Sequence, residues 1–269
     1  MPTHKSTSMK IAIIGVGAMG GALAQGFLRS GKMAADDLWL ANPHTERLKG
    51  MAQAGAHLTT DNVQAVREAQ VVLLCVKPWL AEQVLEEIKP ALEAGRHTLV
   101  SVVAGLAGER LAGLVERDGQ MPDTLLCLPN TAAAVGQSMT FVVPVTATQE
   151  RVAQVEQLLS AVGQVMLTEE RLLPAGMALA SCGIAYAMRY ARAATEGGVE
   201  LGIKATDALR VVLQTMTGAA ALISNNGSNP EAEIDKVTTP GGFTIKGLNE
   251  MEHAGFSSAV IRGLKASVK

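Results

Sequence analysis

The stretch that decides the fold is Lys10-Ile11-Ala12-Ile13-Ile14-Gly15-Val16-Gly17-Ala18-Met19-Gly20, close to the start of the 269-residue chain. Its apolar run ends at Gly15, as expected of a strand that is buried on both faces. The residues that follow, 18–29, have a helical pattern that ends at Gly31. A buried strand, a glycine-rich turn and a helix in direct succession are typical of the first unit of a Rossmann domain, which binds a dinucleotide.

The three glycines follow the spacing G-x-G-x-x-G, and each meets a different demand. Gly15 permits the tight turn, Gly17 lets the backbone approach a pyrophosphate, and Gly20 lets the helix pack closely on the strand. The pyrophosphate would rest on the free N–H groups at the helix start, so Ala18 and Met19 are candidate cofactor contacts too. Because the chain has 27 glycines, such a spacing also arises in ordinary turns. The flanking strand and helix favour the binding interpretation.

Short apolar strands alternate with helices over the first part of the chain, which predicts right-handed βαβ units and a parallel sheet. The expected strands are 10–14, 38–41, 71–76, 98–103, 124–128 and 140–145, with 164–167 at the sheet edge. The expected helices among them are 18–29, 46–53, 80–88 and 106–114. After about Gln149 the pattern is mostly helical, over 152–161, 173–197, 205–224 and 245–253. We therefore expect an α/β fold with three parts: a disordered leader over residues 1–8, an N-terminal Rossmann domain (mainly parallel sheet, helices on both faces) over 9–168, and an all-α dimerisation domain over 169–269.

Composition excludes several classes of partner. The formal net charge is −2 and no run of Lys or Arg occurs, so we expect neither nucleic acid nor an anionic membrane as a partner. The uncharged stretches are broken by Gly, Pro and polar residues, which argues against a membrane span. Cys75, Cys127 and Cys182 lie in apolar segments with no metal-site spacing. They indicate reduced, buried thiols in a cytoplasmic protein.

Other catalytic machinery is not evident in the sequence. There is no G-x-S-x-G, HExxH, paired CxxC or Walker motif, and we expect no bound metal. The histidines are scattered over turns, helix ends and the leader, so we expect surface or capping groups. They are His4, His44, His57, His97 and His253.

The end of the second strand normally selects between the two nicotinamide cofactors, because an acidic residue there binds the ribose of NAD and repels a 2′-phosphate. This chain has Asn42 at that place, and Asp36 and Asp37 come too early. Asn42, Thr45 and Arg47 are suited to hold a phosphate. We therefore expect NADPH, with NADH as the alternative. The plainer interpretation is that Arg47 solvates an exposed helix.

Ligands of a parallel sheet bind beyond the carboxyl ends of its strands. Val76 ends one expected strand, Lys77 and Pro78 follow it directly, and Ala104 and Asn130 follow two later strands. We expect these residues to border the nicotinamide and its ribose. Lys77 is a candidate general acid, although a solvated lysine at a strand end is the more common case.

The second informative stretch is Thr239-Pro240-Gly241-Gly242-Phe243-Thr244, which precedes a predicted helix. Pro-Gly-Gly bends the chain sharply, and converging amides at a helix start are suited to a carboxylate. The hydroxyl groups of Thr239 and Thr244 add donors. The alternative is an ordinary helix start with Thr244 as the N-cap, and the residues alone leave both interpretations open.

A series of motifs runs in order along the chain from Met9 to about Lys265. In the first half they are Ile14–Gly20, Val76-Lys77-Pro78, Ser101–Gly105 and Leu128-Pro129-Asn130-Thr131. In the second half they are Glu196–Val199, Gly218-Ala219-Ala220 and Thr239–Thr244. The series resembles the pyrroline-5-carboxylate reductase family, and its last motif resembles that family's substrate loop.

The resemblance implies NAD(P)H-dependent reduction of the cyclic imine 1-pyrroline-5-carboxylate to L-proline, with hydride transfer to the imine carbon, as a step of proline biosynthesis. The family's carboxylate-binding amides fall on Gly242 and Phe243, beside Gly241 and with help from Thr239. The family's hydroxyl group near the imine nitrogen falls on Thr244, which is therefore the candidate catalytic residue.

The resemblance also bears on the cofactor and on assembly. Asn62 corresponds to a family residue near the adenosine phosphate, which strengthens the choice of NADPH. The family forms homodimers with interleaved helical domains, often assembled into larger rings. We therefore expect a homodimer here, with a larger ring as a further expectation.

Several positions depart from the family's usual residues and leave the preferred imine open. Ala18 replaces Asn, Ala132 replaces Pro, Thr239 replaces Ser and Phe243 replaces a smaller residue. Ile184 stands where the family commonly has proline, which should straighten the helix and restore a backbone N–H. Arg189, on the next turn, is an unexpected cation near the expected substrate cavity.

Three rival functions are compatible with parts of this pattern. A β-hydroxyacid dehydrogenase has a similar layout but needs a general base, commonly a lysine on the first long helix, and residues 173–197 contain no lysine. A reductase of a related cyclic imine is the nearer rival. A non-catalytic dinucleotide sensor would keep the glycine turn but would not need the loop at Thr239–Thr244.

Overall fold

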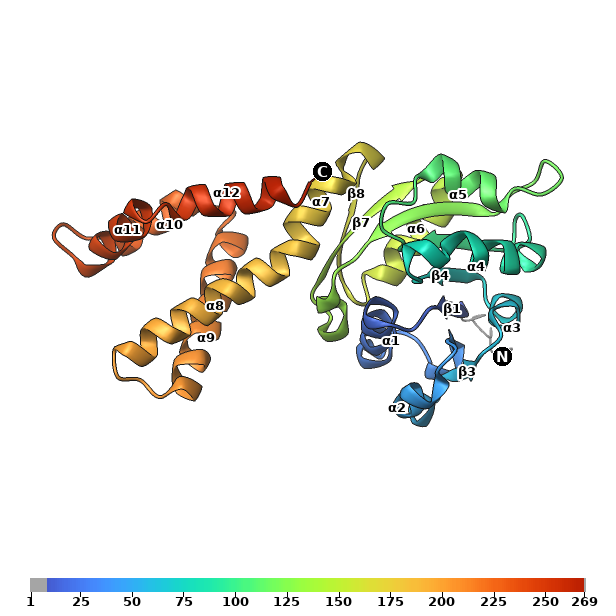
Figure 1. Cartoon of the computed structure of the whole chain (residues 1–269), viewed down its shortest axis with the longest axis horizontal. Helices are drawn as coiled ribbons and strands as arrows, with labels where there is room; N and C mark the ends of the chain where they lie inside the picture. The colour runs from blue at the N-terminus through green and yellow to red at the C-terminus, as the bar shows by residue number, and fades with distance from the viewer. Residues whose placement is uncertain (1–8, 269) are drawn as a thin grey trace, which may run out of the picture. The chain divides into compact units, whose positions relative to one another are not determined.

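The computed structural model describes residues 9–268, so the leader expected at 1–8, with His4, lies outside the described residues. The chain divides into two compact units, with the boundary between Ser181 and Cys182 (Figure 1). The first unit holds the sheet and the second is helical, which confirms the expected α/β class. The domain boundary expected after residue 168 remains a prediction.

An eight-stranded sheet forms the first unit, in the order β3-β2-β1-β4-β5-β6-β7-β8 among the described residues (Figure 1). Every neighbouring pair is parallel except β6 and β7, so the sheet is mainly parallel as expected. The strands are β1 Ile11–Ile14, β2 Leu38–Ala41, β3 His57–Thr59, β4 Val71–Leu74, β5 Thr98–Ser101, β6 Asp123–Leu128, β7 Ser138–Pro144 and β8 Gly163–Leu167.

Helices cover both faces of this sheet because the strands are apolar on both sides. On β1, Ile11 and Ile13 belong to one core cluster, whereas Ala12 and Ile14 belong to the other. The first cluster includes side chains of α1 and α6, and the second includes side chains of α3, α4 and α5. These helices are α1 Ala18–Ser30, α2 Lys49–Gln53, α3 Asn62–Glu68, α4 Ala81–Ile88, α5 Gly108–Val115 and α6 Gln149–Leu159.

Two elements of this unit, β3 and α3, were not predicted from the sequence. The edge strand β3 has only three residues, too few to show a period of two, and the helix α3 that follows it has seven. The helix expected over 46–53 begins instead as a 3-10 turn, Thr45–Leu48, before α2. The expected edge strand at 164–167 is confirmed as β8, which pairs with β7.

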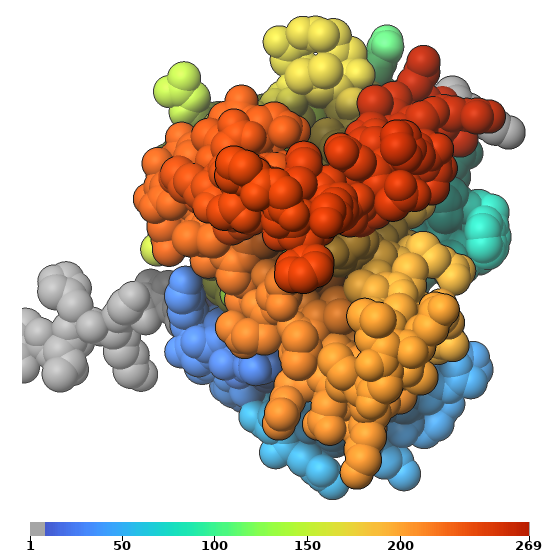
Figure 2. Space-filling view, turned by 90° about the vertical axis from the view of Figure 1, so that its left-hand side faces the viewer, coloured from blue at the N-terminus to red at the C-terminus, as the bar shows by residue number. Residues whose placement is uncertain are grey.

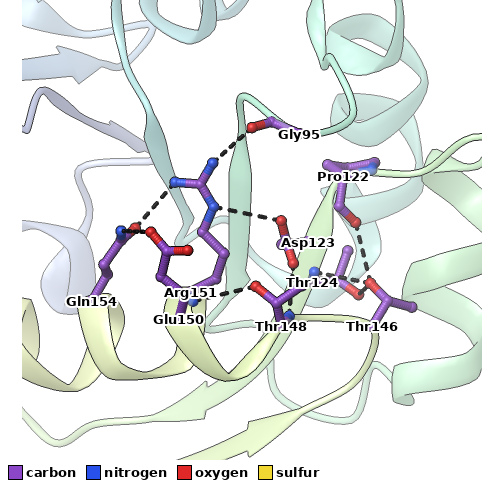
Figure 3. A network of polar contacts seen from close by, with 9 residues as sticks. All are labelled: Gly95, Pro122, Asp123, Thr124, Thr146, Thr148, Glu150, Arg151 and Gln154. Carbon is purple, nitrogen blue, oxygen red and sulfur yellow. Dashed lines mark hydrogen bonds and ion pairs between the residues drawn. The ribbon is translucent and has the colours of Figure 1, made fainter.

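A polar network ties α6 to the start of β6 (Figure 3). The Arg151 guanidinium lies 3.6 Å from the Asp123 carboxylate, and both side chains are mostly buried. Arg151 also donates to the Gly95 carbonyl at 2.7 Å, and the Thr148 N–H donates to Asp123 at 2.8 Å. The network lies where β6 begins, at the sheet end opposite to the glycine turn, and so serves the fold.

The second unit consists of α8 Gly183–Glu200, α9 Ala205–Asn226, α10 Pro230–Val237, α11 Phe243–His253 and α12 Phe256–Ala266. The helices α10 and α12 were not predicted from the sequence. Helices α8 and α9 pack closely through small residues, since a Cβ on Gly198 would lie 3.1 Å from that of Ala208. The Tyr186 hydroxyl of α8 donates to the Gly263 carbonyl of α12 at 3.3 Å.

Few side chains of this helical unit are buried. Figure 2 shows the surface of its helices in orange and red. Among its described hydrophobic residues only Ala191 and Ala208 are buried. Large apolar side chains are exposed instead: Met188, Val199, Leu201, Val211, Leu213, Leu222, Val237, Phe243, Val260 and Ile261. An apolar surface of this extent marks an interaction site.

The helix expected to run straight from 173 to 197 has an irregular start. After α7 Leu173–Gly176 the chain forms a π turn over Met177–Cys182 and returns to α-helix at Gly183. The expectation that Ile184 straightens this segment is therefore wrong, because the widened turn forms without a proline.

One helical segment, Glu170–Glu200, is long and apolar enough to cross a membrane by length and composition alone. Its second half carries Arg189, Arg192 and Glu196, and charged side chains are costly inside a bilayer. A single such segment is weak support for a membrane span.

His97 is a correction to the expectation of surface or capping histidines. It is fully buried at the start of β5. Its Nδ1 accepts the Glu93 N–H at 2.9 Å, so Nε2 carries the proton and donates to the Val66 carbonyl at 3.2 Å. Burial, together with the nearby Arg96 cation, lowers the pKa of His97. The ring is therefore neutral and links α3 to the start of β5.

We expect His97 to make folding sensitive to mild acid. The unfolded chain binds a proton near pH 6.5 whereas the folded chain resists it, so the free energy of unfolding falls as the pH drops below 6.5. The slope reaches at most about 1.4 kcal/mol per pH unit and ends below the folded pKa. Denaturant unfolding between pH 7.5 and 5 measures it.

The matched variants are His97→Asn, which keeps an acceptor near the Nδ1 position, and His57→Asn, which removes a half-exposed histidine. The pH slope should shrink in H97N and persist in H57N. An unchanged slope in H97N would contradict the assignment.

Candidate functional site

The glycine turn after β1 has the backbone that a dinucleotide fingerprint requires. Gly15 has φ +90°, which L side chains rarely adopt, and a Cβ there would lie 2.8 Å from Val76 Cγ1. A Cβ on Gly20 would clash with the Gly15 carbonyl and lie 3.2 Å from the Cys75 Cβ. The predicted steric roles of both glycines are confirmed.

Helix α1 begins with its first amides uncapped. Its N-cap is Gly17, with no side-chain hydrogen bond, and nothing lies within 4 Å of the position of a Gly17 Cβ. The N–H groups at Ala18 and Met19 therefore have room for an anionic group and no competing side-chain acceptor. Their contact with a cofactor remains a prediction.

Strand register brings the other candidates to the same edge. Ile14 pairs with both Ala41 and Leu74, and Leu74 pairs with Ser101. The residues after these strands thus share the carboxyl edge of the sheet with the glycine turn. The exposed ones are Lys77, Pro78 and Ala104, and Val76 is half-buried.

The edge beside β2 carries no carboxylate on the strand tip. Arg47 is exposed and forms no ion pair among the described residues, and Thr45 opens the 3-10 turn that holds it. Asn42 is fixed by its N–H, which donates to the Thr59 carbonyl of β3 at 3.1 Å. This polar, cationic corner is suited to a phosphate, as the sequence predicts.

The unpredicted strand β3 explains how Asn62 reaches this edge. Asn62 is the first residue of α3, shortly after β3, and Asp61 caps that helix. The Asn62 Nδ2 donates to Glu87 at 3.0 Å. Glu87 is thus an acidic neighbour that the sequence patterns missed, because it lies 25 residues away on α4.

Asn130 differs from the other candidates because both ends of its side chain are engaged. It is buried, its Oδ1 accepts the Ala132 N–H at 3.0 Å, and its Nδ2 donates to the Ala180 carbonyl at 3.2 Å. Contact of Asn130 with the cofactor stays a prediction that the geometry leaves untested.

Cys75 and Cys127 are poorly suited to act as nucleophiles. Burial raises the pKa of the Cys75 thiol to about 12 and raises that of Cys127 as well. All three cysteines are free, and Cys75 and Cys182 are partly rather than fully buried. Within residues 9–268 no three His, Cys, Asp or Glu side chains gather as a metal site would need.

The loop before α11 is a type II turn. The Gly242 N–H donates to the Thr239 carbonyl at 2.9 Å, with Pro240 and Gly241 between them and φ +73° at Gly241. A Cβ on Gly242 would lie 2.5 Å from the Thr239 hydroxyl oxygen. The positive φ at Gly241 and the close contact at Gly242 therefore call for glycine at both positions, and Pro240 suits the second position of the turn, which agrees with the sharp bend expected there.

The helix start excludes the alternative in which Thr244 is the N-cap, and it changes which amides are open to a carboxylate. Gly242, not Thr244, is the N-cap of α11, and it provides no side-chain hydrogen bond. The Gly242 N–H closes the turn, so the amides open to a carboxylate begin at Phe243 and Thr244. Thr244 lies in the first helical turn, where its hydroxyl group is exposed.

A cation that the sequence patterns missed lies one turn into α11. The Lys246 Nζ lies 5.9 Å from the centre of the Phe243 ring, which is 92% exposed. The spacing of three residues on a helix is the signal that would have found this pair. Lys246 adds positive charge near an anion-accepting helix start.

Comparison with known proteins decides the family. Residues 170–269 match the model for pyrroline-5-carboxylate reductase dimerisation, and residues 10–105 match that for NADP oxidoreductase, coenzyme F420-dependent. Pyrroline-5-carboxylate reductase 2 of Dictyostelium discoideum is 34% identical, covering 99% of this chain and 93% of its own length. The chain belongs to the pyrroline-5-carboxylate reductase family.

Two further relatives show how far this likeness extends. Pyrroline-5-carboxylate reductase 1 of Dictyostelium discoideum is 37% identical over 96% of this chain, which spans about half (48%) of that longer protein. The crystal structure of pyrroline carboxylate reductase from Plasmodium falciparum superimposes with a TM-score of 0.87 and 23% identity, covering 97% of this chain and 95% of that one. The fold is therefore shared across both units of the chain.

We expect Gly20→Ala to damage the dinucleotide site and the neighbouring Gly21→Ala to leave it intact. A Cβ at position 20 meets the Gly15 backbone, whereas nothing lies within 4 Å of a Cβ at position 21. G20A should lower the melting temperature and weaken NADPH binding at least about tenfold, since helix and strand must separate. Fluorescence titration with NADPH and thermal unfolding measure both effects. Equal NADPH affinity in G20A and G21A would contradict the role of the turn.

Proposed function

We propose that the chain reduces 1-pyrroline-5-carboxylate to L-proline with NADPH. The observation that carries the proposal is the uncapped start of α11, behind a type II turn, in a chain of the pyrroline-5-carboxylate reductase family. Such a helix start accepts a carboxylate, which a cyclic imine acid supplies. The glycine turn before α1 accepts the other anion, the cofactor pyrophosphate.

NADPH is the proposed cofactor, and NADH is the second choice. The tip of β2 has Asn42 where a carboxylate would repel the 2′-phosphate, and Arg47 lies close by in sequence without an ion pair among residues 9–268. Thr45 and Asn62 complete the proposed phosphate contacts. The related Plasmodium falciparum reductase was solved with NADP bound, which supports the choice.

The chain's own residues mainly bind and orient the reactants. The Phe243 and Thr244 amides and the Thr239 hydroxyl group hold the carboxylate, and Gly241 and Gly242 shape the turn behind it. The Thr244 hydroxyl orients the ring nitrogen. NADPH, when bound, supplies the hydride, which adds to the imine carbon while the ring nitrogen gains one proton, giving NADP⁺ and L-proline. A protonated imine is already electrophilic, so catalysis is mostly positioning.

Val76, Lys77, Pro78 and Ala104 border the nicotinamide end in this proposal. Their place at the carboxyl edge of the sheet supports it, since ligands of open parallel sheets bind there. Lys77 is exposed and keeps the nicotinamide end polar. Its role as a general acid is not required, because Thr244 faces the imine nitrogen in the proposed arrangement.

A second copy of the chain is the proposed partner. Residues 170–269 match a dimerisation model, and the helical unit leaves large apolar side chains exposed. We propose a homodimer with interleaved helical domains, which assembles further into a ring, in the cytoplasm and without nucleic acid or membrane as a partner. Obligate interfaces resemble a domain core cut in half, which agrees with so little internal burial.

The second candidate is a reductase of a related cyclic imine carboxylate. The residues that favour it are Phe243 and Arg189, an exposed ring and an exposed cation that depart from the family's usual pattern. A β-hydroxyacid dehydrogenase is disfavoured because α8 contains no lysine.

The direct test is NADPH oxidation by the purified protein with a panel of cyclic imine acids of five- and six-membered rings. We expect turnover with 1-pyrroline-5-carboxylate and a kcat/KM above about 10⁴ M⁻¹s⁻¹, an ordinary value for an enzyme with its own substrate. Preference for a six-membered ring would favour the second candidate. No turnover with any imine acid would contradict both.

Three variants locate that activity. Thr244→Val should lower kcat about 10- to 100-fold, because it removes the group that orients the ring nitrogen. Gly242→Ala should raise KM for the imine, whereas Gly247→Ala, with nothing within 4 Å of its Cβ position, should not. None should change KM for NADPH. Full activity in T244V would remove Thr244 from the mechanism.

We also expect the helical unit to be stable only in an assembly. Light scattering at micromolar concentration should give at least twice the mass of one chain. The melting temperature should fall on dilution, since association stabilises by mass action. A monomer whose melting temperature is independent of concentration would contradict the proposed dimer.

A further inference from the structure

The π turn at Met177–Cys182 is the feature that neither the glycine turn nor the substrate loop accounts for. A π turn pairs carbonyls with N–H groups five residues ahead, and the chain returns to α-helical pairing at Gly183. Where this pairing returns to the α-helical spacing of four residues, the helix has one carbonyl more than it has N–H groups to pair with. A carbonyl near the end of the turn therefore needs a donor from elsewhere.

Two neighbouring residues of the first unit contact this turn. The Asn130 Nδ2 donates to the Ala180 carbonyl at 3.2 Å, and the Ser181 hydroxyl donates to the Pro129 carbonyl at 3.3 Å. Both contacts lie within one compact unit, which ends at Ser181. The end of β6 is thus bonded to two successive positions of the turn.

The orientation of the Asn130 amide is fixed by its other partner. Its Oδ1 accepts the Ala132 N–H, so the NH₂ group must face Ala180. The Asn130 N–H donates to the Ser138 hydroxyl at 3.1 Å, and Ser138 contacts the buried Thr140 at 3.0 Å. Asn130 is 5% exposed, so this network is shielded from water. Such a network is rigid when all its members are satisfied.

We propose that Asn130 is a positioning residue whose amide donates to the Ala180 carbonyl at the end of the π turn, and thereby holds the turn in its widened form. In a regular α-helix the Ala180 carbonyl accepts the N–H of Ile184, four residues ahead. In this proposal both ends of the Asn130 side chain form hydrogen bonds within the fold, and its contact with the cofactor stays a prediction.

The turn lies where the chain leaves the cofactor unit for the helical unit. Its last residue, Cys182, directly follows the boundary, and α8 begins at the next residue. Helix α8 leads on toward the substrate loop in the sequence. Hydride transfer needs reacting atoms within roughly 3.5 Å, so a loosened turn should slow the chemical step more than cofactor binding. This kinetic part rests on the proposed function.

The first test uses proline as a probe of the Ala180 carbonyl. Proline inside a helix removes an N–H and clashes with the carbonyl four residues back. If Asn130 already satisfies that carbonyl, Ile184→Pro should change the melting temperature by less than about 3 °C, whereas Ala193→Pro in the regular part of α8 should lower it by about 10 °C. An equal loss in I184P and A193P would overturn the proposal.

The second test removes the Asn130 donor to Ala180 and keeps the Asn130 acceptor for the Ala132 N–H. Asn130→Asp preserves the acceptor for the Ala132 N–H but turns an oxygen toward the Ala180 carbonyl. The control is Asn229→Asp, because Asn229 caps α10 in the same way, accepting the Glu231 N–H at 2.8 Å. Hydrogen exchange of residues 177–186 should accelerate at least about tenfold in N130D and stay unchanged in N229D.

Kinetics separate positioning from cofactor contact. With 1-pyrroline-5-carboxylate, N130D should lower kcat at least about tenfold and leave KM for NADPH within a factor of about two. A raised KM for NADPH with unchanged exchange would overturn the proposal in favour of a direct cofactor contact. Exchange and melting need no substrate, so they test the Asn130 contact even if the wild-type protein fails to reduce the imine.

Discussion

The backbone N–H groups at the start of a helix need acceptors, and the account of this protein depends on how two helices meet that need. Side chains cap several helices of the chain: Asp61 caps α3, Thr148 caps α6 and Asn229 caps α10. By contrast, α1 and α11 begin at glycines that offer no side-chain acceptor. Each follows a glycine with positive φ, so the approaching chain bends away from the helix start. Both starts are thereby suited to anions, one for a pyrophosphate and one for a carboxylate.

The need of backbone groups for hydrogen-bond partners also bears on the π turn at Met177–Cys182, where the first unit ends. The buried Asn130, which follows β6, donates a hydrogen bond to the Ala180 carbonyl in the π turn. The family commonly has proline at the position of Ile184, and this chain keeps an irregular turn without it. In the proposed account, the hydrogen bond from Asn130 to Ala180, rather than a missing N–H at residue 184, holds the turn in its widened form.

Much of the first unit could be predicted from the sequence. Its strands are buried on both faces and therefore form apolar runs, and Gly15 and Gly20 each stand where a side chain would clash. The edge strand β3 could not be predicted, since three residues show no period. The hydrogen bond of His97 joins it to Val66, 31 residues away, and that of Asn130 joins it to Ala180, 50 residues away, so neither contact is visible in a local pattern. The turn at Gly242 was predicted, but not that its N–H is engaged within the turn. For the helical unit, periodicity revealed α8, α9 and α11 but missed α10 and α12.

The central claim is that the two uncapped helix starts hold the two anions of one reaction. A crystal structure of the protein with NADP⁺ and L-proline tests it most directly. The account predicts the pyrophosphate on the amides at Ala18 and Met19, and the proline carboxylate on those at Phe243 and Thr244. A carboxylate bound away from the start of α11, with the dinucleotide in place, would contradict it.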